Sequence, residues 1–223
     1  MKLTKDGGAN LITADTSITQ ITPTLYRLGG NLANLTNARG NYQLSVNGSF
    51  TDLAGNSTTS SAADSWQFNA GPTISPLTNA TVSKTLIPTG FQLFAGTSVQ
   101  DPESLNLAGG ALLVSITKNA NAFDEIYVKS QGTAAGQISL NIDKVFYGGV
   151  QIGTLSGGSG ADPLRVDFNA QSTAAAAQAL VRSIYFRNLS ASPSLLPRTI
   201  NLSITDGDGG ISAPRSKIVS FGP

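Results

Sequence analysis

The sequence predicts an all-β protein made of two antiparallel β-sandwich modules, the second of which carries one short helix. The 223 residues exceed the length of one typical sandwich. Only 12% of residues are charged against 40% hydrophobic, and the chain contains 24 Gly and 10 Pro, a composition typical of many short strands joined by tight turns. Short stretches in which apolar and polar residues alternate recur along the chain, as half-buried strands require.

The first module is expected to contain two well-marked strands. Residues 41–48 alternate, and their apolar stripe consists of Tyr42, Leu44 and Val46. The sequence DLAGN at residues 52–56 has the residue types of a turn. A second strand follows at residues 65–68, and since Trp66 and Phe68 share one face of it, we expect these two side chains to anchor the core.

The dipeptide Gly71-Pro72 marks the predicted module boundary. Proline cannot donate to a strand ladder, and it favours an extended conformation in the residue before it. The chain also ends in Phe221-Gly222-Pro223, so two strand ends of similar form are followed by Gly-Pro. The sequence therefore predicts modules at residues 1–71 and 72–223.

The second module shows repeated alternation interrupted by one helical segment. Its apolar stripes are Leu112, Val114 and Ile116; Ile126 and Val128; Ile138 and Leu140; Leu164, Val166 and Phe168; and Ile200, Leu202 and Ile204. Glycine-rich turns such as Gly148-Gly149 separate them. From Ser172 to Ile184 the spacing changes to i, i+3, i+4, i+7, carried by Ala177, Leu180, Val181 and Ile184. This segment predicts one amphipathic helix that closes an end of the sandwich.

Composition excludes several classes of function. The formal net charge is +1, and the 14 basic residues are scattered, so nucleic-acid binding is not expected. The chain has no His and no Cys, which removes the commonest general base, zinc ligands and thiol nucleophile, so we predict no enzyme. Polar residues follow Met1, and no apolar run suits a signal peptide or a membrane span. We expect any export signal to lie upstream, and no insertion into a membrane.

The first module carries a family resemblance. NYQLSVNGSFTDLAGN followed by SWQF, within residues 41–68, resembles the last strands of bacterial immunoglobulin-like (Ig-like) repeats. Such repeats usually begin with two further strands before the segment that corresponds to LTKDGG here. The resemblance therefore implies a truncated module with an unpaired sheet edge, which invites a strand-swapped dimer.

Residues 101–210 resemble the cadherin-like repeats of large bacterial adhesins and haemolysin-type calcium-binding proteins. The matching segments, in order, are DPES, LAGGALLVSIT, FDEIYV, YGGVQIGTLSGG, ALVRSIYFRN, PRT and DGDGG. The resemblance implies a structural or adhesive spacer module at the cell surface or outside the cell, with calcium at module junctions. Its expected partners are the neighbouring repeat modules of the parent chain, and a cell-surface protein or glycan.

Two acidic turns are the candidate calcium site: Asp101 with Glu103, and Asp206 with Asp208. Calcium takes six to eight oxygen ligands, which carboxylates in glycine-rich turns can supply. Asp124 is a possible additional ligand, whereas Lys84 introduces a positive charge where related repeats often carry a Glu. Both turns are also consistent with ordinary hairpin chemistry.

Asp124 and Glu125 form a third acidic point, ahead of the strand IYV. Consecutive strand residues point to opposite faces of a sheet, so the two carboxylates are not expected to serve one site. A solvated strand edge is the simpler interpretation.

A carbohydrate-binding β-sandwich module is the alternative function. Exposed aromatic side chains stack on sugar rings, and the candidates are Tyr127, Phe146, Tyr147 and Tyr185. These residues are dispersed and lie within alternating strands, so core packing explains them equally well. Specific glycan binding lost on mutating Tyr127 or Tyr147 would favour the alternative.

Overall fold

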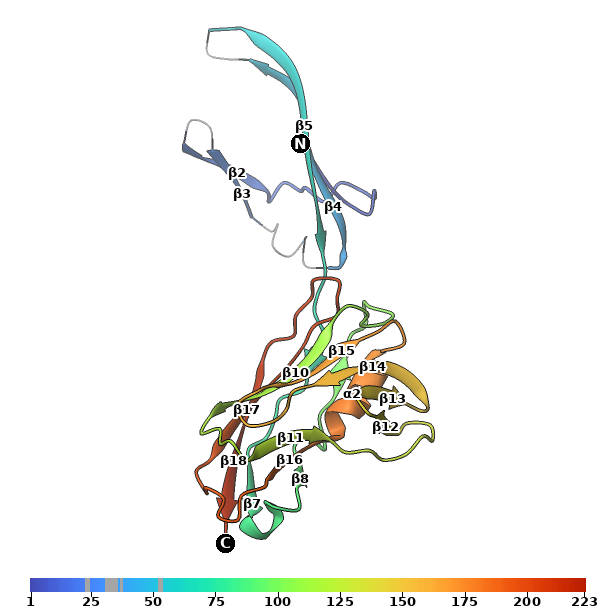
Figure 1. Cartoon of the computed structure of the whole chain (residues 1–223). Helices are drawn as coiled ribbons and strands as arrows, with labels where there is room; N and C mark the ends of the chain where they lie inside the picture. The colour runs from blue at the N-terminus through green and yellow to red at the C-terminus, as the bar shows by residue number, and fades with distance from the viewer. Residues whose placement is uncertain (23–24, 31–35, 37, 52–53) are drawn as a thin grey trace. The chain divides into compact units, whose positions relative to one another are not determined.

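The computed structural model describes residues 1–22, 25–30, 36, 38–51 and 54–223 (Figure 1). The chain divides into two compact units, Met1–Ala70 and Gly71–Pro223, so the division falls next to Gly71-Pro72. Among the described residues, no helix has the length and apolar character needed to cross a membrane.

The first unit contains a three-stranded antiparallel sheet and a separate hairpin. The sheet has the order β1-β4-β5, with β1 at Lys2–Lys5, β4 at Gly40–Thr51 and β5 at Ser57–Phe68. The hairpin joins β2 (Ser17–Thr22) to β3 (Leu25–Gly29). Of the predicted DLAGN turn, Asp52 and Leu53 lie outside the described residues.

The small core of this unit differs from the expected one. Leu3 and Tyr42 are its fully buried large apolar side chains among the described residues, at 2% and 1% exposure. Trp66 stacks on Tyr42 with ring centroids 5.7 Å apart but is 38% exposed, and Phe68 is half-buried. The expectation that Trp66 and Phe68 anchor the core was wrong, because β5 is an edge strand whereas β4 is covered by strands on both sides.

The second unit is built from three sheets. The largest has eight strands in the order β12-β13-β14-β15-β10-β17-β18-β7, and smaller sheets have the orders β11-β16-β8 and β6-β9. Among the described residues of this unit, β18 and β7 are the only pair of strands that run parallel. The strands are β6 Thr73–Ile74, β7 Ala80–Ser83, β8 Phe91–Gln92, β9 Val99–Gln100, β10 Ala111–Lys118, β11 Asp124–Val128, β12 Ile138–Asn141, β13 Lys144–Tyr147, β14 Val150–Ser156, β15 Leu164–Phe168, β16 Ile184–Asn188, β17 Arg198–Ile204 and β18 Arg215–Gly222.

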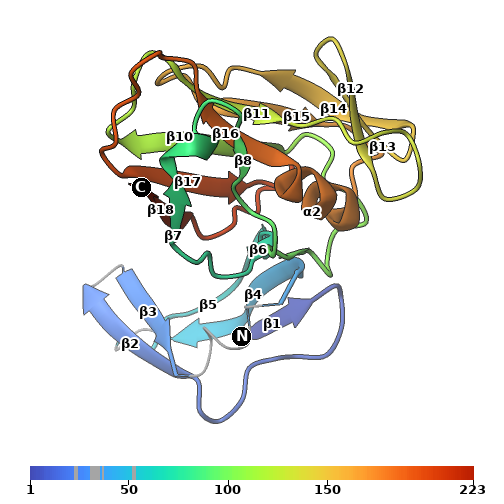
Figure 2. The same ribbon diagram turned by 90° about the horizontal axis from the view of Figure 1, so that it is seen from below.

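One continuous apolar cluster joins these sheets into a sandwich. The eight-stranded sheet contributes inward-facing residues such as Val114 and Leu202, and β16 contributes Phe186, all at 0% exposure. Figure 2 shows the helix α2 (Ala174–Arg182) at one end of the strands. The predicted all-β class is confirmed, and α2 is the single α-helix in the described part of the chain.

The helix is shorter than the segment predicted for it. Thr173 is the N-cap, and its side chain accepts a hydrogen bond from the Ala176 amide at 3.2 Å. The helix ends at Arg182, so Ile184 begins β16 instead of closing the helical stripe. Ile184 is fully buried in this role. Its side chain therefore fits the apolar spacing of the helix and the inward face of the strand equally well. A short 3-10 helix also spans Lys84–Leu86.

Candidate acidic pole and its surroundings

The two predicted acidic turns each hold one buried carboxylate. Asp101 follows β9 and is 7% exposed, and Asp206 follows β17 and is 0% exposed. The Asp101 Oδ1 atom accepts from the amides of Glu103 at 3.4 Å and Ser104 at 3.2 Å. The Asp206 Oδ1 atom accepts from the Asp208 amide at 2.9 Å, and from the Gly210 amide at the same distance. Each carboxylate thus organises its own turn.

Glycines allow the backbone segments around these turns to approach each other closely. A Cβ atom on Gly110 would lie 2.1 Å from the Thr205 carbonyl oxygen, and one on Gly71 would lie 2.3 Å from the Ile211 amide nitrogen. Gly207, at φ +82°, faces the Ala108 carbonyl in the same way. We call Asp101, Ser104 and Asp206, with the backbone of these segments, the acidic pole of the second unit.

The electrostatics of the acidic pole favour a positive charge. Burial raises the pKa of Asp101, the Ser104 and Glu103 amides oppose that rise, and the nearby Asp206 carboxylate adds to it. Among the described residues, the buried Asp101 Oδ2 and Ser104 Oγ atoms form no hydrogen bond of good geometry, although the Ser104 hydroxyl is close enough to lower the pKa of Asp101 slightly. A buried oxygen of this kind is costly unless it gains a donor or a cation.

The structure brings together only part of the predicted ligand set. Asp101 and Asp206 are close enough to interact electrostatically. Glu103 and Asp208 follow in the same turns, and Asp208 is exposed. Within the described ranges, no group of three or more acidic, His or Cys side chains is arranged to hold a metal ion. The donors at the pole are therefore two carboxylates, the Ser104 hydroxyl and backbone carbonyls.

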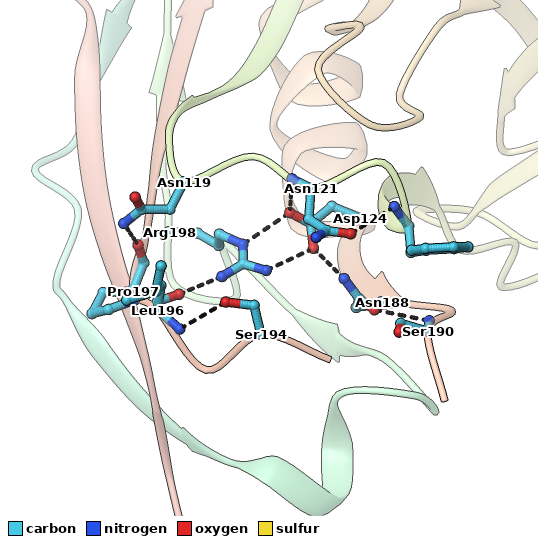
Figure 3. Close-up of polar contacts among 10 residues, drawn as sticks. Asn119, Asn121, Asp124, Asn188, Ser190, Ser194, Leu196, Pro197 and Arg198 are labelled. Atoms are coloured by element: carbon cyan, nitrogen blue, oxygen red, sulfur yellow. Dashed lines mark hydrogen bonds and ion pairs between the residues drawn. The ribbon is translucent and has the colours of Figure 1, made fainter. Parts of the chain in front are cut away.

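Asp124 lies elsewhere, so the structure does not support it as a ligand at this pole. It is 1% exposed, and it faces Arg198, which is also 1% exposed (Figure 3). Arg198 Nε donates to Asp124 Oδ2 at 2.8 Å, and Arg198 Nη2 donates to Oδ1 at 3.2 Å. Arg198 begins β17 and Asp206 lies just beyond its end, so at about 3.3 Å per residue the Cα atoms of Arg198 and Asp206 are roughly 25 Å apart. Asp124, which binds Arg198, therefore lies at the other end of β17 from Asp206.

Further hydrogen bonds complete this buried ion pair. Asn188 Nδ2 donates to Asp124 Oδ1 at 2.6 Å, and the Asn121 amide donates to Oδ2 at 2.8 Å. Arg198 also donates to the Leu196 carbonyl, and its guanidinium lies 5.6 Å from the centre of the Phe221 ring. The expectation of a solvated strand edge was wrong for Asp124, whose carboxylate instead holds β11, β16 and β17 together.

The alternating sequence pattern already contained evidence for the Asp124–Arg198 pair. Asp124 continues the inward stripe of Ile126 and Val128, and Arg198 continues the inward stripe of Ile200 and Leu202. Two opposite charges at the ends of inward stripes predict a buried pair. Arg198 was not predicted as a site residue, because the alternation does not show that the start of β17 lies beside the start of β11.

The opposite face of β11 carries a different cluster. Glu125 accepts from Arg187 Nε at 2.5 Å, as expected for a residue pointing away from Asp124. The Tyr127 and Tyr185 rings lie beside each other with centroids 5.9 Å apart. Lys129 Nζ lies 4.9 Å from the Tyr185 ring, and the Arg187 guanidinium lies 4.8 Å from the Tyr127 ring. Two of the four predicted sugar-stacking residues are thus adjacent.

The other two predicted aromatic residues lie in a different sheet. Phe146 and Tyr147 belong to β13 of the eight-stranded sheet, whereas Tyr127 and Tyr185 belong to the sheet of β11, β16 and β8. All four side chains are partly exposed. The structure therefore divides the predicted aromatic set into two separate pairs.

Comparison with known proteins gives little further information. No protein-family model matches the chain, and no curated protein sequence matches it. Among solved structures, the titin domains Z1Z2 in complex with telethonin are similar at 12% identity, with a TM-score of 0.23. That similarity covers 99% of this chain and 80% of the titin chain. A TM-score this low supports no conclusion about the function of this chain.

Proposed function

We propose that the chain is a structural or adhesive spacer module of a large secreted or cell-surface repeat protein, rigidified by calcium at the acidic pole. One observation carries the calcium part: Asp101 and Asp206 are both buried and interact, and the Asp101 Oδ2 atom has no neighbouring donor besides the Ser104 hydroxyl among the described residues. The spacer part rests on the resemblance of the sequence to adhesin repeats.

The oxygen donors at the pole fit calcium better than magnesium. Calcium accepts six to eight oxygens in irregular geometry, whereas magnesium demands a near-ideal octahedron. Asp101, Asp206 and Ser104 would contribute side-chain oxygens, and the neighbouring turns would contribute carbonyls. Calcium would neutralise two buried carboxylates, and Glu103 and Asp208 could complete the set after a small movement of their turns.

Binding at this pole would stiffen the unit where several chain segments meet. The turns after β9 and β17 and the segment at Gly110 lie against one another there. A cation bound only by the folded state stabilises it by mass action. A spacer module needs this property, because a rigid module keeps its orientation in a repeat array.

Calorimetric titration with calcium tests the proposal directly. We expect saturable binding by the whole chain and its loss in Asp101→Asn. The matched control is Asp143→Asn, which changes an exposed carboxylate outside the acidic pole. Equal binding by both variants would show that calcium does not bind at Asp101.

The proposal includes an extracellular or cell-surface location and no enzymatic activity. The chain contains no His and no Cys, and the Asp124 carboxylate is occupied by Arg198. The proposed partners are neighbouring repeat modules of the parent chain.

A carbohydrate-binding surface is the second candidate function, and the adjacent Tyr127 and Tyr185 rings favour it. Both rings lie on one sheet face with cationic side chains beside them. Sugar binding lost in Tyr185→Ala but retained in Tyr147→Ala would support this function. A glycan array without specific binding would leave the spacer function as the sole candidate.

A further inference from the structure

The 71–223 unit contains a cavity that no acidic side chain lines. Its volume is about 340 Å³, and its walls come from residues 76–78, residues 92–97 and Lys217 of β18. Cavities of this size accommodate small ligands. Leu93 and Phe94 close its floor but are almost fully buried, so the apolar surface open to a ligand comes from Pro76, Leu77 and Ala95, which are exposed or half-buried.

Lys217 gives this cavity its chemical character. Its side chain is half-buried, and Nζ donates to the Leu93 carbonyl at 2.7 Å. No carboxylate of the described residues forms an ion pair with it. Burial lowers the pKa of Lys217. An ammonium has three N–H donors, so two remain after the bond to Leu93.

The walls provide no negative charge to balance this lysine. Lys217 is the one ionisable side chain among the residues that line the cavity. A second positive charge borders the cavity, because Arg182 Nε donates to the carbonyl of the lining residue Thr97 at 2.8 Å. A partly desolvated cation with a second cation nearby attracts an anion.

We propose that this cavity binds a carboxylate that carries a short apolar chain, with Lys217 as its counter-ion. The carboxylate would accept from Nζ, and the apolar chain would lie on Pro76, Leu77 and Ala95. Such a ligand replaces the lost hydration of the ammonium and covers apolar surface at the same time. This inference goes beyond the proposed function, and it does not depend on calcium.

Two kinds of molecule carry a carboxylate on a short apolar chain. One is a free aliphatic acid, and the other is a glutamate side chain of a partner protein. Butyrate represents the first source, and N-acetyl-glutamate N-methylamide represents the second. Their uncharged counterparts, butyramide and N-acetyl-glutamine N-methylamide, control for the charge.

Nuclear magnetic resonance titration of the whole chain provides the test. We expect butyrate to shift the amide signals of residues 92–97 in a saturable manner, with affinity about tenfold above that of butyramide. Lys217→Met should reduce the butyrate affinity at least about tenfold, since it removes the charge and keeps an unbranched stem. Lys144→Met, which changes an exposed lysine on β13, should leave the affinity unchanged.

Three results would overturn the inference. The amide shifts could fail to saturate with both acids, an acid and its amide could bind with equal affinity, or Lys217→Met could keep the full affinity for butyrate. Stronger binding of butyrate than of the glutamate derivative would identify a free acid as the ligand, and the reverse order would identify a protein side chain. If Lys217→Met does not fold, a pH series on the unmodified chain decides. Affinity should then fall as pH rises through the Lys217 pKa, which lies below its ordinary value of 10.5.

Discussion

Arg198 and Asp124 form a two-pronged ion pair inside the second unit, with N–O distances of 2.8 and 3.2 Å. Both side chains are 1% exposed, so water does not screen the pair. Two further donors, from Asn188 and Asn121, satisfy the carboxylate. Such a pair is costly to break, because removing one partner leaves a buried charge without compensation.

Asp124→Asn is therefore expected to destabilise the second unit by about 3–5 kcal/mol, with a similar loss for Arg198→Met. The double variant should lose less than the sum of the two, because neither charge is then left alone. Guanidinium-induced unfolding followed by circular dichroism measures these differences.

The control for this series is the exposed pair Arg165–Asp167, whose side chains are 49% and 56% exposed. Breaking it by Arg165→Met should cost at most about 1 kcal/mol. An Asp124→Asn variant as stable as the unmodified chain would show that the buried pair does not stabilise the unit.

The alternation of apolar and polar residues predicted the strands and their buried faces. It could not predict which turns lie next to one another in the folded chain. Stripes such as Leu112 with Val114 fixed which residues face the core, as the structure confirms. The same periodicity cannot state which turns meet, so Asp124 was grouped with Asp206 although the two lie at opposite ends of β17. Ile184 shows why the end of the helix was also mispredicted: this apolar residue fits both the helical spacing and the strand alternation.

Asp101 gives the calcium-free protein a specific pH dependence. Burial raises its folded-state pKa above the ordinary value of 3.8, so protonation favours the folded state. This stabilisation is present below pH 3.8 and is lost as pH rises through the folded pKa. In chelator at neutral pH, Asp101→Asn should therefore melt at a higher temperature than the unmodified chain, and the difference should vanish in acid.

Asparagine at this position keeps an Oδ1 acceptor for the Glu103 and Ser104 amides, so the comparison isolates the charge. Asp143→Asn serves as the control, since this residue is exposed, and its melting curve should follow the unmodified chain at each pH. An Asp101→Asn variant that melts lower at neutral pH would contradict the account.

Gly110→Ala should destabilise the second unit by about 1–3 kcal/mol, because the new methyl group has no room. The Cβ atom would lie 2.1 Å from the Thr205 carbonyl oxygen, beside the acidic pole. Gly96→Ala is the matched control, since its Cβ would meet nothing within 4 Å, and a change of at most about 0.5 kcal/mol is expected. Denaturant midpoints measure both, and equal midpoints would refute the close approach.

The two units should differ when they are expressed separately. Residues 72–223 contain the continuous apolar cluster, and we expect a monomer with one cooperative melting transition. Residues 1–71 expose Ile18, Leu25 and Tyr26 at 56–59%, and β5 lies at the edge of its sheet. We expect a strand-swapped dimer. Light scattering after size-exclusion chromatography measures both masses, and a monomeric, cooperatively melting 1–71 segment would refute the expected pairing through the sheet edge.

Calcium dependence of the melting temperature tests the central claim most directly. With millimolar calcium the whole chain should melt at a higher temperature than in chelator, magnesium should substitute poorly, and Asp101→Asn should abolish the calcium shift while Asp143→Asn retains it. A melting temperature that is the same in calcium and in chelator would contradict the proposed role of the acidic pole, and both turns would then be ordinary hairpin turns.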